Sequence, residues 1–136
     1  MSSNETTTDS VAALSQHIAA PPQLSLVVIR AADPGRLANF YAALGMSFDI
    51  ERHGNGPAHY VSTDAGITFE IYPRRDDDPL AAGIRLGFTT VALDVVLKAM
   101  QGFGAQIVSP AGMTPWGRRA VLIDPEGHKV EITEKP

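Results

Sequence analysis

The chain has 136 residues, of which 44% are hydrophobic and 19% are charged, and its formal net charge is −4. These values are typical of one globular domain and argue against a nucleic-acid partner, which would need a basic face. The lack of cysteine excludes disulfides, thiolate metal ligands and thiol nucleophiles. No apolar run approaches the roughly 20 residues that span a bilayer, and the polar start does not resemble a secretion signal. We therefore expect a soluble, cytoplasmic protein with no membrane partner.

Residues 1–22 are expected to form an appendage outside the domain. Their start, MSSNETTTDS, is poor in apolar residues, which is typical of disorder. After it, Val11, Leu14 and Ile18 lie at helical spacing, and the proline pair at 21–22 would end such a helix. Two interpretations remain open: a flexible tail, or a short arm helix that packs on a partner subunit.

A single domain is predicted over residues 23–136, and it begins with a buried, β-branched strand at 24–30. A helix should follow over 34–44, because apolar residues recur there at i, i+3, i+4 and i+7. These residues are Leu37, Phe40, Tyr41 and Leu44. Turn-forming residues then separate three predicted strands, at 46–52, 58–63 and 67–73.

The same order of elements is predicted again after a charged linker at 74–79. A strand is expected at 83–90 and a helix at 91–103. The apolar face of this helix comprises Leu93, Val96, Leu97 and Met100. The last three strands are expected at 105–110, 118–124 and 128–134.

The two halves are similar in pattern, which predicts an internal duplication. The helix-ending residues Gly45 and Gly104 are 59 positions apart, and Glu70 and Glu131 in the final strands are 61 apart. We therefore predict an α+β fold of two tandem βαβββ repeats, at about 23–75 and 83–134. They should form a curved, trough-like mixed sheet with helices on the outer face.

Several segments resemble the vicinal oxygen chelate superfamily, which contains glyoxalase I, bleomycin-resistance proteins, fosfomycin-resistance proteins and extradiol dioxygenases. The segments that carry the resemblance are ADPGRLANFYAALG, FEIYP and WGRRAVLIDPEGHKVEITE. The resemblance covers about residues 23–134 and implies a concave cleft for a small molecule. It also implies a homodimer with two symmetry-related clefts.

The resemblance also marks four positions where metal-using members place ligands, in the first and last strand of each half. The last-strand positions carry Glu70 and Glu131, which match. The first-strand positions carry Leu26 and Arg85, which offer no lone pair to a metal. The resemblance therefore implies at most an incomplete set for a divalent metal, and no cofactor is firmly indicated.

Two histidines provide a different candidate pair of metal ligands. His53 and His59 flank the short GNGPA hairpin, and neutral imidazoles are common ligands of transition metals. A hairpin this short favours a position for both residues on the solvent-exposed rim.

The candidate ligand-binding residues are three arginines and three aromatic residues. Guanidinium groups suit a carboxylate or phosphate, and aromatic rings supply flat apolar walls. These residues are Arg30, Arg85, Arg119, Tyr60, Tyr72 and Trp116. Strand alternation should point Glu131 into the cleft, close to Arg85 and across from Glu70, where it could also act as a catalytic base.

The first functional hypothesis is a glyoxalase- or bleomycin-resistance-like protein that binds a small organic anion, with its chemistry unassigned. One alternative is a metal-dependent lyase or isomerase of the lactoylglutathione lyase type, with Glu131 as ligand and base. Dioxygenase-like oxidoreductase chemistry is a further possibility for an enzyme. Another alternative is a non-catalytic sequestering or regulatory module.

Overall fold

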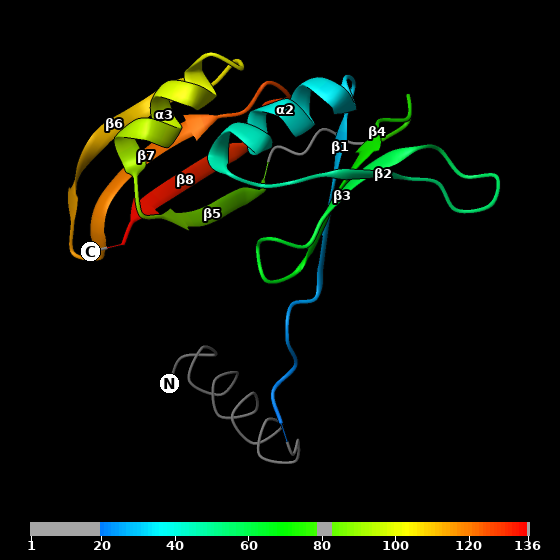
Figure 1. Ribbon diagram of the computed structural model, residues 1–136, viewed down its shortest axis with the longest axis horizontal. Helices are drawn as coiled ribbons and strands as arrows, with labels where there is room; N and C mark the ends of the chain where they lie inside the picture. The colour runs from blue at the N-terminus through cyan, green and yellow to red at the C-terminus, as the bar shows by residue number, and fades with distance from the viewer. Residues whose placement is uncertain (1–19, 79–82, 136) are drawn as a thin grey trace, which may run out of the picture.

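The computed structural model, shown in Figure 1, describes residues 20–78 and 83–135. Its elements follow the order β1, α2, β2, β3, β4, β5, α3, β6, β7 and β8. The predicted appendage at 1–22 falls outside the described residues except for its last positions, which are exposed. None of the described helices has the length and hydropathy needed to cross a membrane.

The first module is a four-stranded sheet covered by one helix. It comprises β1 (Leu26–Ala31), α2 (Pro34–Leu44), β2 (Asp49–Glu51), β3 (His59–Ser62) and β4 (Thr68–Pro73). The strands lie in the order β1-β4-β3-β2. The first strand pairs in parallel with β4, while the remaining pairs are antiparallel.

The second module repeats this arrangement. It comprises β5 (Arg85–Thr90), α3 (Leu93–Gln101), β6 (Gln106–Thr114), β7 (Gly117–Ile123) and β8 (Lys129–Glu134). Its strand order, β5-β8-β7-β6, corresponds position by position to that of the first sheet. Again only the first and last strands pair in parallel. The predicted α+β class and the tandem βαβββ duplication are confirmed.

The element boundaries differ from the predicted ones mainly at two strands. The strand expected at 46–52 forms ladder pairs only over Asp49–Glu51, because Met46 turns into the core instead. The strand expected at 105–110 continues to Thr114. Register shifts between Ile107 and Gly112 let β6 continue past Pro110, which cannot donate to the ladder.

Both modules share one hydrophobic core, with α2 and α3 packed against each other on the same side (Figure 1). Tyr41 of α2 lies at the junction, with its ring centroid 5.2 Å from that of Phe69 and 5.8 Å from that of Phe88. These two phenylalanines come from different sheets, so the aromatic contacts join the modules. The predicted apolar stripes of both helices face this core.

Each sheet therefore uses its helix-side face for the shared core and leaves its other face uncovered by the described helices. In β1 the core-facing Ile29 is 2% exposed, whereas Leu26 and Val28 on the opposite face are 48% and 37% exposed. In β8, Val130 and Ile132 are buried, and Glu131 points to the other side. We call these uncovered surfaces the open faces. Since both sheets point away from the same core, the open face of one does not cover that of the other.

Candidate binding site on the open faces of the sheets

The open face of the second sheet carries a cluster of two arginines and one glutamate. Arg85 Nε of β5 donates to Glu131 Oε1 of β8 at 2.6 Å. Arg119 Nη1 of β7 approaches the other oxygen of this carboxylate at 3.4 Å. The contact between Glu131 and Arg85 agrees with the sequence prediction. Two guanidinium groups thus share one carboxylate, and the cluster keeps a net positive charge.

This cluster is only partly buried, so solvent still reaches it. The side chains of Arg85, Arg119 and Glu131 are 45%, 30% and 26% exposed. An arginine has five N–H donors, and the carboxylate uses few of those available on the two side chains. The remaining donors can therefore bind an anionic group of a ligand.

The open face of the first sheet carries a different cluster, built around Glu70 of β4. Its Oε2 lies 3.3 Å from Nε2 of His59 on β3. The ring of His59 stacks on Tyr72, with centroids 4.0 Å apart and planes inclined by 10°. The guanidinium of Arg30 lies 4.9 Å from the centroid of Tyr72 and completes the stack.

The expectation that both histidines lie on the solvent rim is wrong for His59. It is 1% exposed, because Tyr72 covers one side of its ring and its Nδ1 lies 3.2 Å from the carbonyl oxygen of Pro57. His53 does lie on the rim, with its side chain 71% exposed, 3.8 Å from Glu51.

The hydrogen-bonding roles around His59 leave one ring nitrogen without a partner. A carbonyl oxygen can only accept, so Nδ1 carries the proton and donates to Pro57. In this tautomer Nε2 is an acceptor and faces an acceptor oxygen of Glu70. Within the described residues, Nε2 is the buried side-chain polar atom that lacks a hydrogen-bond partner. A proton, a donor group or a cation between the two atoms would satisfy both.

The residues present do not make up a complete metal site. The 3.3 Å separation of His59 Nε2 and Glu70 Oε2 is compatible with two neighbouring ligands at about 2.0–2.1 Å from one ion. However, residues 20–78 and 83–135 contain no group of three or more His, Cys, Asp and Glu side chains placed to hold a metal. The carboxylate of Glu131 is instead occupied by the arginines.

Glu70 and Glu131 occupy matching strand positions but do not share a partner. Glu70 contacts His59, whereas Glu131 contacts Arg85 and Arg119. Within one chain Arg85 therefore contacts Glu131 but not Glu70, because the two open faces belong to separate sheets.

The remaining candidate residues lie outside these two clusters. Tyr60 points toward the helix side, where its hydroxyl lies close to Gly35 at the start of α2. Trp116 is 75% exposed in the turn between β6 and β7, and so it does not stand in a cleft of this chain. Strand alternation explains Tyr60, since its neighbour His59 takes the open face.

A pocket of about 490 Å³ lies between the two sheets, and we call it the inter-sheet pocket. Its wall is mainly apolar, with Asp64, Arg85 and Thr89 as polar contributors. The apolar residues are Leu24, Val27, Ala65, Ile67, Phe69, Leu86 and Phe88. Arg85 belongs both to this wall and to the Glu131 cluster.

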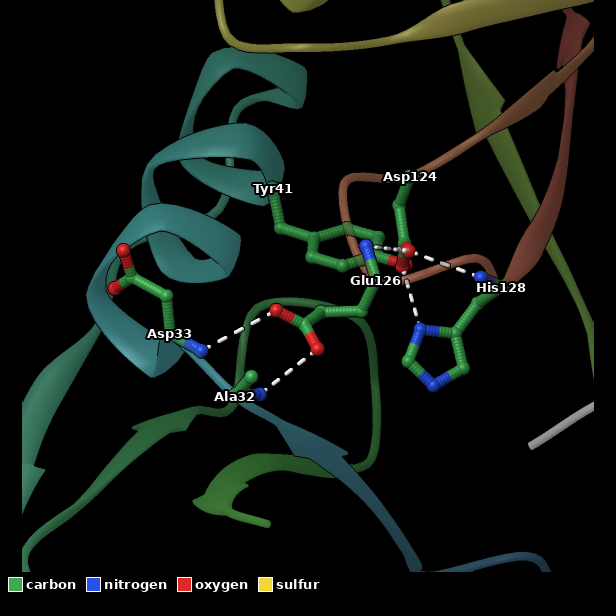
Figure 2. Close-up of polar contacts among 6 residues, drawn as sticks. All are labelled: Ala32, Asp33, Tyr41, Asp124, Glu126 and His128. Carbon is green, nitrogen blue, oxygen red and sulfur yellow. Dashed lines mark hydrogen bonds and ion pairs between the residues drawn. The ribbon is translucent and has the colours of Figure 1, made fainter. Parts of the chain in front are cut away.

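A buried polar network, not predicted from the sequence, holds the turn between β7 and β8 (Figure 2). Asp124 Oδ2 accepts from the hydroxyl of Tyr41 at 2.7 Å and lies 2.8 Å from His128 Nδ1. Its Oδ1 accepts from the backbone N–H groups of Glu126 and His128. The local sequence signal for this turn is the DPEGH segment at 124–128, which does not reveal the contact with Tyr41. Tyr41 comes from the other module, so the network joins the two halves.

Burial raises the pKa of Tyr41, and the neighbouring Asp124 carboxylate raises it further. For Asp124 burial acts in the same direction, but the hydrogen bonds from His128 and Tyr41 outweigh it and lower the pKa. The ionised carboxylate therefore stabilises the fold above the unfolded-state pKa. This contribution is lost as the pH falls through the lower, folded-state pKa.

The turn also holds the chain at the start of α2, next to the cap in which Asp33 Oδ1 accepts from the backbone N–H of Arg36 at 3.1 Å. The carboxylate of Glu126 accepts from the backbone N–H groups of Ala32 and Asp33 at 2.8 and 3.2 Å (Figure 2). Glu134 does the same for α3, accepting from the backbone N–H of Leu93 at 2.8 Å. Both glutamates link elements distant in sequence, which assigns the DPEGHKVEITE segment a structural role.

Two tandem βαβββ modules with open-faced sheets are the arrangement of a glyoxalase-like domain. Residues 26–133 match the sequence profile of the glyoxalase-like domain, and the chain belongs to that family. No curated protein matches the sequence.

Solved structures of this superfamily share the fold. TnmS3, an antibiotic binding protein from Streptomyces sp. CB03234, has a TM-score of 0.67 at 20% identity, covering 86% of this chain and 98% of its own. A glyoxalase/bleomycin resistance protein/dioxygenase family enzyme from Burkholderia phytofirmans has a TM-score of 0.66 at 20% identity, covering 82% and 97%. A superfamily member from Sphaerobacter thermophilus has a TM-score of 0.65 at 18% identity, covering 85% and 98%.

Proposed function

We propose that the protein binds a small organic anion on its open faces, and that it does so as a homodimer. The observation that carries the proposal is the convergence of Arg85 and Arg119 on the single carboxylate of Glu131. A pair of arginines held by one counter-charge forms a pre-oriented set of donors with positive charge remaining. A carboxylate or phosphate group of a ligand complements such a set.

The rest of the ligand would contact apolar and aromatic side chains. Leu26 and Val28 are exposed on the open face of the first sheet, beside the stack of Tyr72 and His59. Ligand sites combine a few oriented polar groups with mainly apolar walls. The second sheet supplies the polar groups and the first sheet supplies the apolar wall. A site that uses both therefore requires the two open faces to be next to each other.

A second copy of the chain can bring the two open faces together. Within one chain the sheets point away from a shared core, so the first open face of one subunit would meet the second open face of its partner. A two-fold axis would create two equivalent clefts. Exposed apolar side chains such as Met113 and Trp116, at 80% and 75%, also favour an interface.

Binding without a reaction is the function that the geometry favours. Both oxygens of Glu131 are engaged by guanidinium groups, which leaves this carboxylate poorly placed as a metal ligand or as a base in lyase chemistry. The shared fold of TnmS3, described as an antibiotic binding protein, is compatible with a sequestering role.

A thermal-shift screen with matched acids and amides tests this proposal. The ligands would be benzoate, cinnamate and naphthoate derivatives, each paired with its uncharged amide. Binding to the native state raises its stability by about 2.7 kcal/mol at a ligand concentration of 100 Kd. We expect at least one acid to raise Tm while its amide does not. Equal shifts from acids and amides, or no shift from any acid, would contradict an anion site.

A further inference from the structure

Leu24, close to the start of the described chain at residue 20, contributes to the wall of the inter-sheet pocket. A second hollow of about 330 Å³ lies beside the start of β1 and shares Leu24 and Ile67 with the inter-sheet pocket. We call the pocket and this hollow together the inter-sheet groove. Phe69 and Phe88 lie at the base of the groove, and these residues also belong to the contacts that join the modules. The groove is therefore an apolar surface built into the junction of the two halves.

The chain leaves this groove instead of folding back into it. Residues 20–25 are exposed, and the segment that leads into β1 extends beyond both sheets in Figure 1. The proline pair at 21–22 favours an extended, stiff conformation. Residues 20–22 line neither hollow, and three extended residues reach roughly 10 Å, so the described chain starts outside the groove of its own chain.

The preceding segment has the side chains that such a groove would accept. Val11, Leu14 and Ile18 recur at i, i+3 and i+7, the spacing of one apolar helical face. A short amphipathic helix in an apolar groove is a common mode of recognition. A segment of this length does not stabilise itself as an isolated helix in water, so a binding surface would be needed to order it.

We propose that residues 11–18 of one chain dock in the inter-sheet groove of a second copy, and that the exchange is reciprocal. The second copy is the one required by the proposed homodimer, on which this inference rests. The proline-containing segment at 20–22 acts as the spacer that carries each arm across, and two-fold symmetry places one arm in each groove.

Cross-linking tests the exchange directly, because the chain contains no cysteine. Leu14→Cys and Ile67→Cys would be introduced into separate chains with tags of different mass, and the chains would be refolded together. A short bismaleimide tolerates imprecise geometry between the two thiols. We expect a covalent heterodimer of the two variants, whereas Gln16→Cys, on the opposite face of the helical stripe, should cross-link poorly with Ile67→Cys.

The double variant Leu14→Cys/Ile67→Cys separates exchange from self-docking. Exchange predicts covalent dimers from this chain, whereas closure of the link within single chains would overturn the proposal. Light scattering of the unmodified protein separates the two proposals. A monomer at micromolar concentration would contradict both the proposed homodimer and the arm exchange. A dimer without any Leu14–Ile67 cross-link would contradict only the arm exchange.

A charge substitution provides a second readout that does not depend on cross-linking. Leu14→Asp/Ile18→Asp should raise the dimer dissociation constant by about tenfold or more, because two apolar anchors become charged. Ala12→Asp/Gln16→Asp, on the opposite helical face and with the same change of charge, is the matched control and should leave this constant unchanged. An unchanged dissociation constant for the double aspartate variant would contradict docking of this face.

Discussion

At the residue scale, two histidines have the same burial but different surroundings. His59 and His128 are 1% and 2% exposed. The second has its Nδ1 close to Asp124 within a connected network, whereas Nε2 of the first faces another acceptor. Since an unpaired buried polar atom lowers stability, the polar atoms of His59 should contribute less to folding than those of His128.

This contrast predicts losses of stability of different size for the same substitution at His59 and His128. His59→Phe keeps the stacking on Tyr72 and removes the unpaired nitrogen, so its effect on the free energy of unfolding should stay within about 1 kcal/mol. His128→Phe removes a partner of the buried Asp124 carboxylate and should cost about 3 kcal/mol or more. Urea denaturation of both variants measures the difference. Equal losses for the two would show that His59 is also structural.

The contact between Arg85 and Glu131 permits a direct measurement of coupling. Both side chains are partly exposed, so their interaction should contribute at most about 1 kcal/mol to stability. A double-mutant cycle on Arg85→Met and Glu131→Gln isolates the coupling free energy between the two side chains. Denaturant unfolding and anion affinity are the two readouts. We expect positive coupling in both readouts. Coupling near zero in both would mean that Glu131 is an ordinary solvated strand residue.

At the element scale, most helices and strands were predictable because each leaves a local pattern. Residues Leu37 and Tyr41 follow the 3.6-residue period and are buried, and Val130 and Ile132 follow the alternation of a strand. The partners of polar groups were less predictable. That Glu126 binds the chain at the start of α2 and Asp124 binds Tyr41 depends on how the modules pack, which no local period records.

The two long-range glutamate contacts can be tested through Glu126. Glu126→Ala leaves the backbone N–H groups of Ala32 and Asp33 without their carboxylate and should lower the free energy of unfolding by about 0.5–2 kcal/mol. Glu51→Ala, at an exposed strand position, provides a matched control with the same change of charge. A loss no larger than that of the control would show that water replaces the carboxylate.

At the scale of the whole molecule, duplication places equivalent residues on separate sheets. The sequence offset correctly paired Glu70 with Glu131, but it could not show which side chains each would contact. His59 lies next to Glu70 on the neighbouring strand β3, and Arg119 lies next to Glu131 on the neighbouring strand β7. The sites of the two halves therefore differ in chemistry although their backbones correspond.

This division of chemistry between the sheets bears on metal binding. His59 and Glu70 offer two ligands, while the arginines occupy Glu131. After exposure to Zn²⁺, Ni²⁺, Mn²⁺ or Fe²⁺ and desalting, elemental analysis should find metal far below a stoichiometric amount. Stoichiometric retention would contradict this prediction and favour the metal-dependent lyase alternative.

The central claim is that the open face of the second sheet binds an anion through its arginines. The most direct test is calorimetric titration of the best acid from the thermal-shift screen into the wild type and Arg119→Met. The variant should raise Kd about tenfold or more, equivalent to about 1.4 kcal/mol. Arg75→Met, at an exposed arginine outside the cluster, should leave Kd unchanged. Equal Kd values for the wild type and Arg119→Met would contradict the claim.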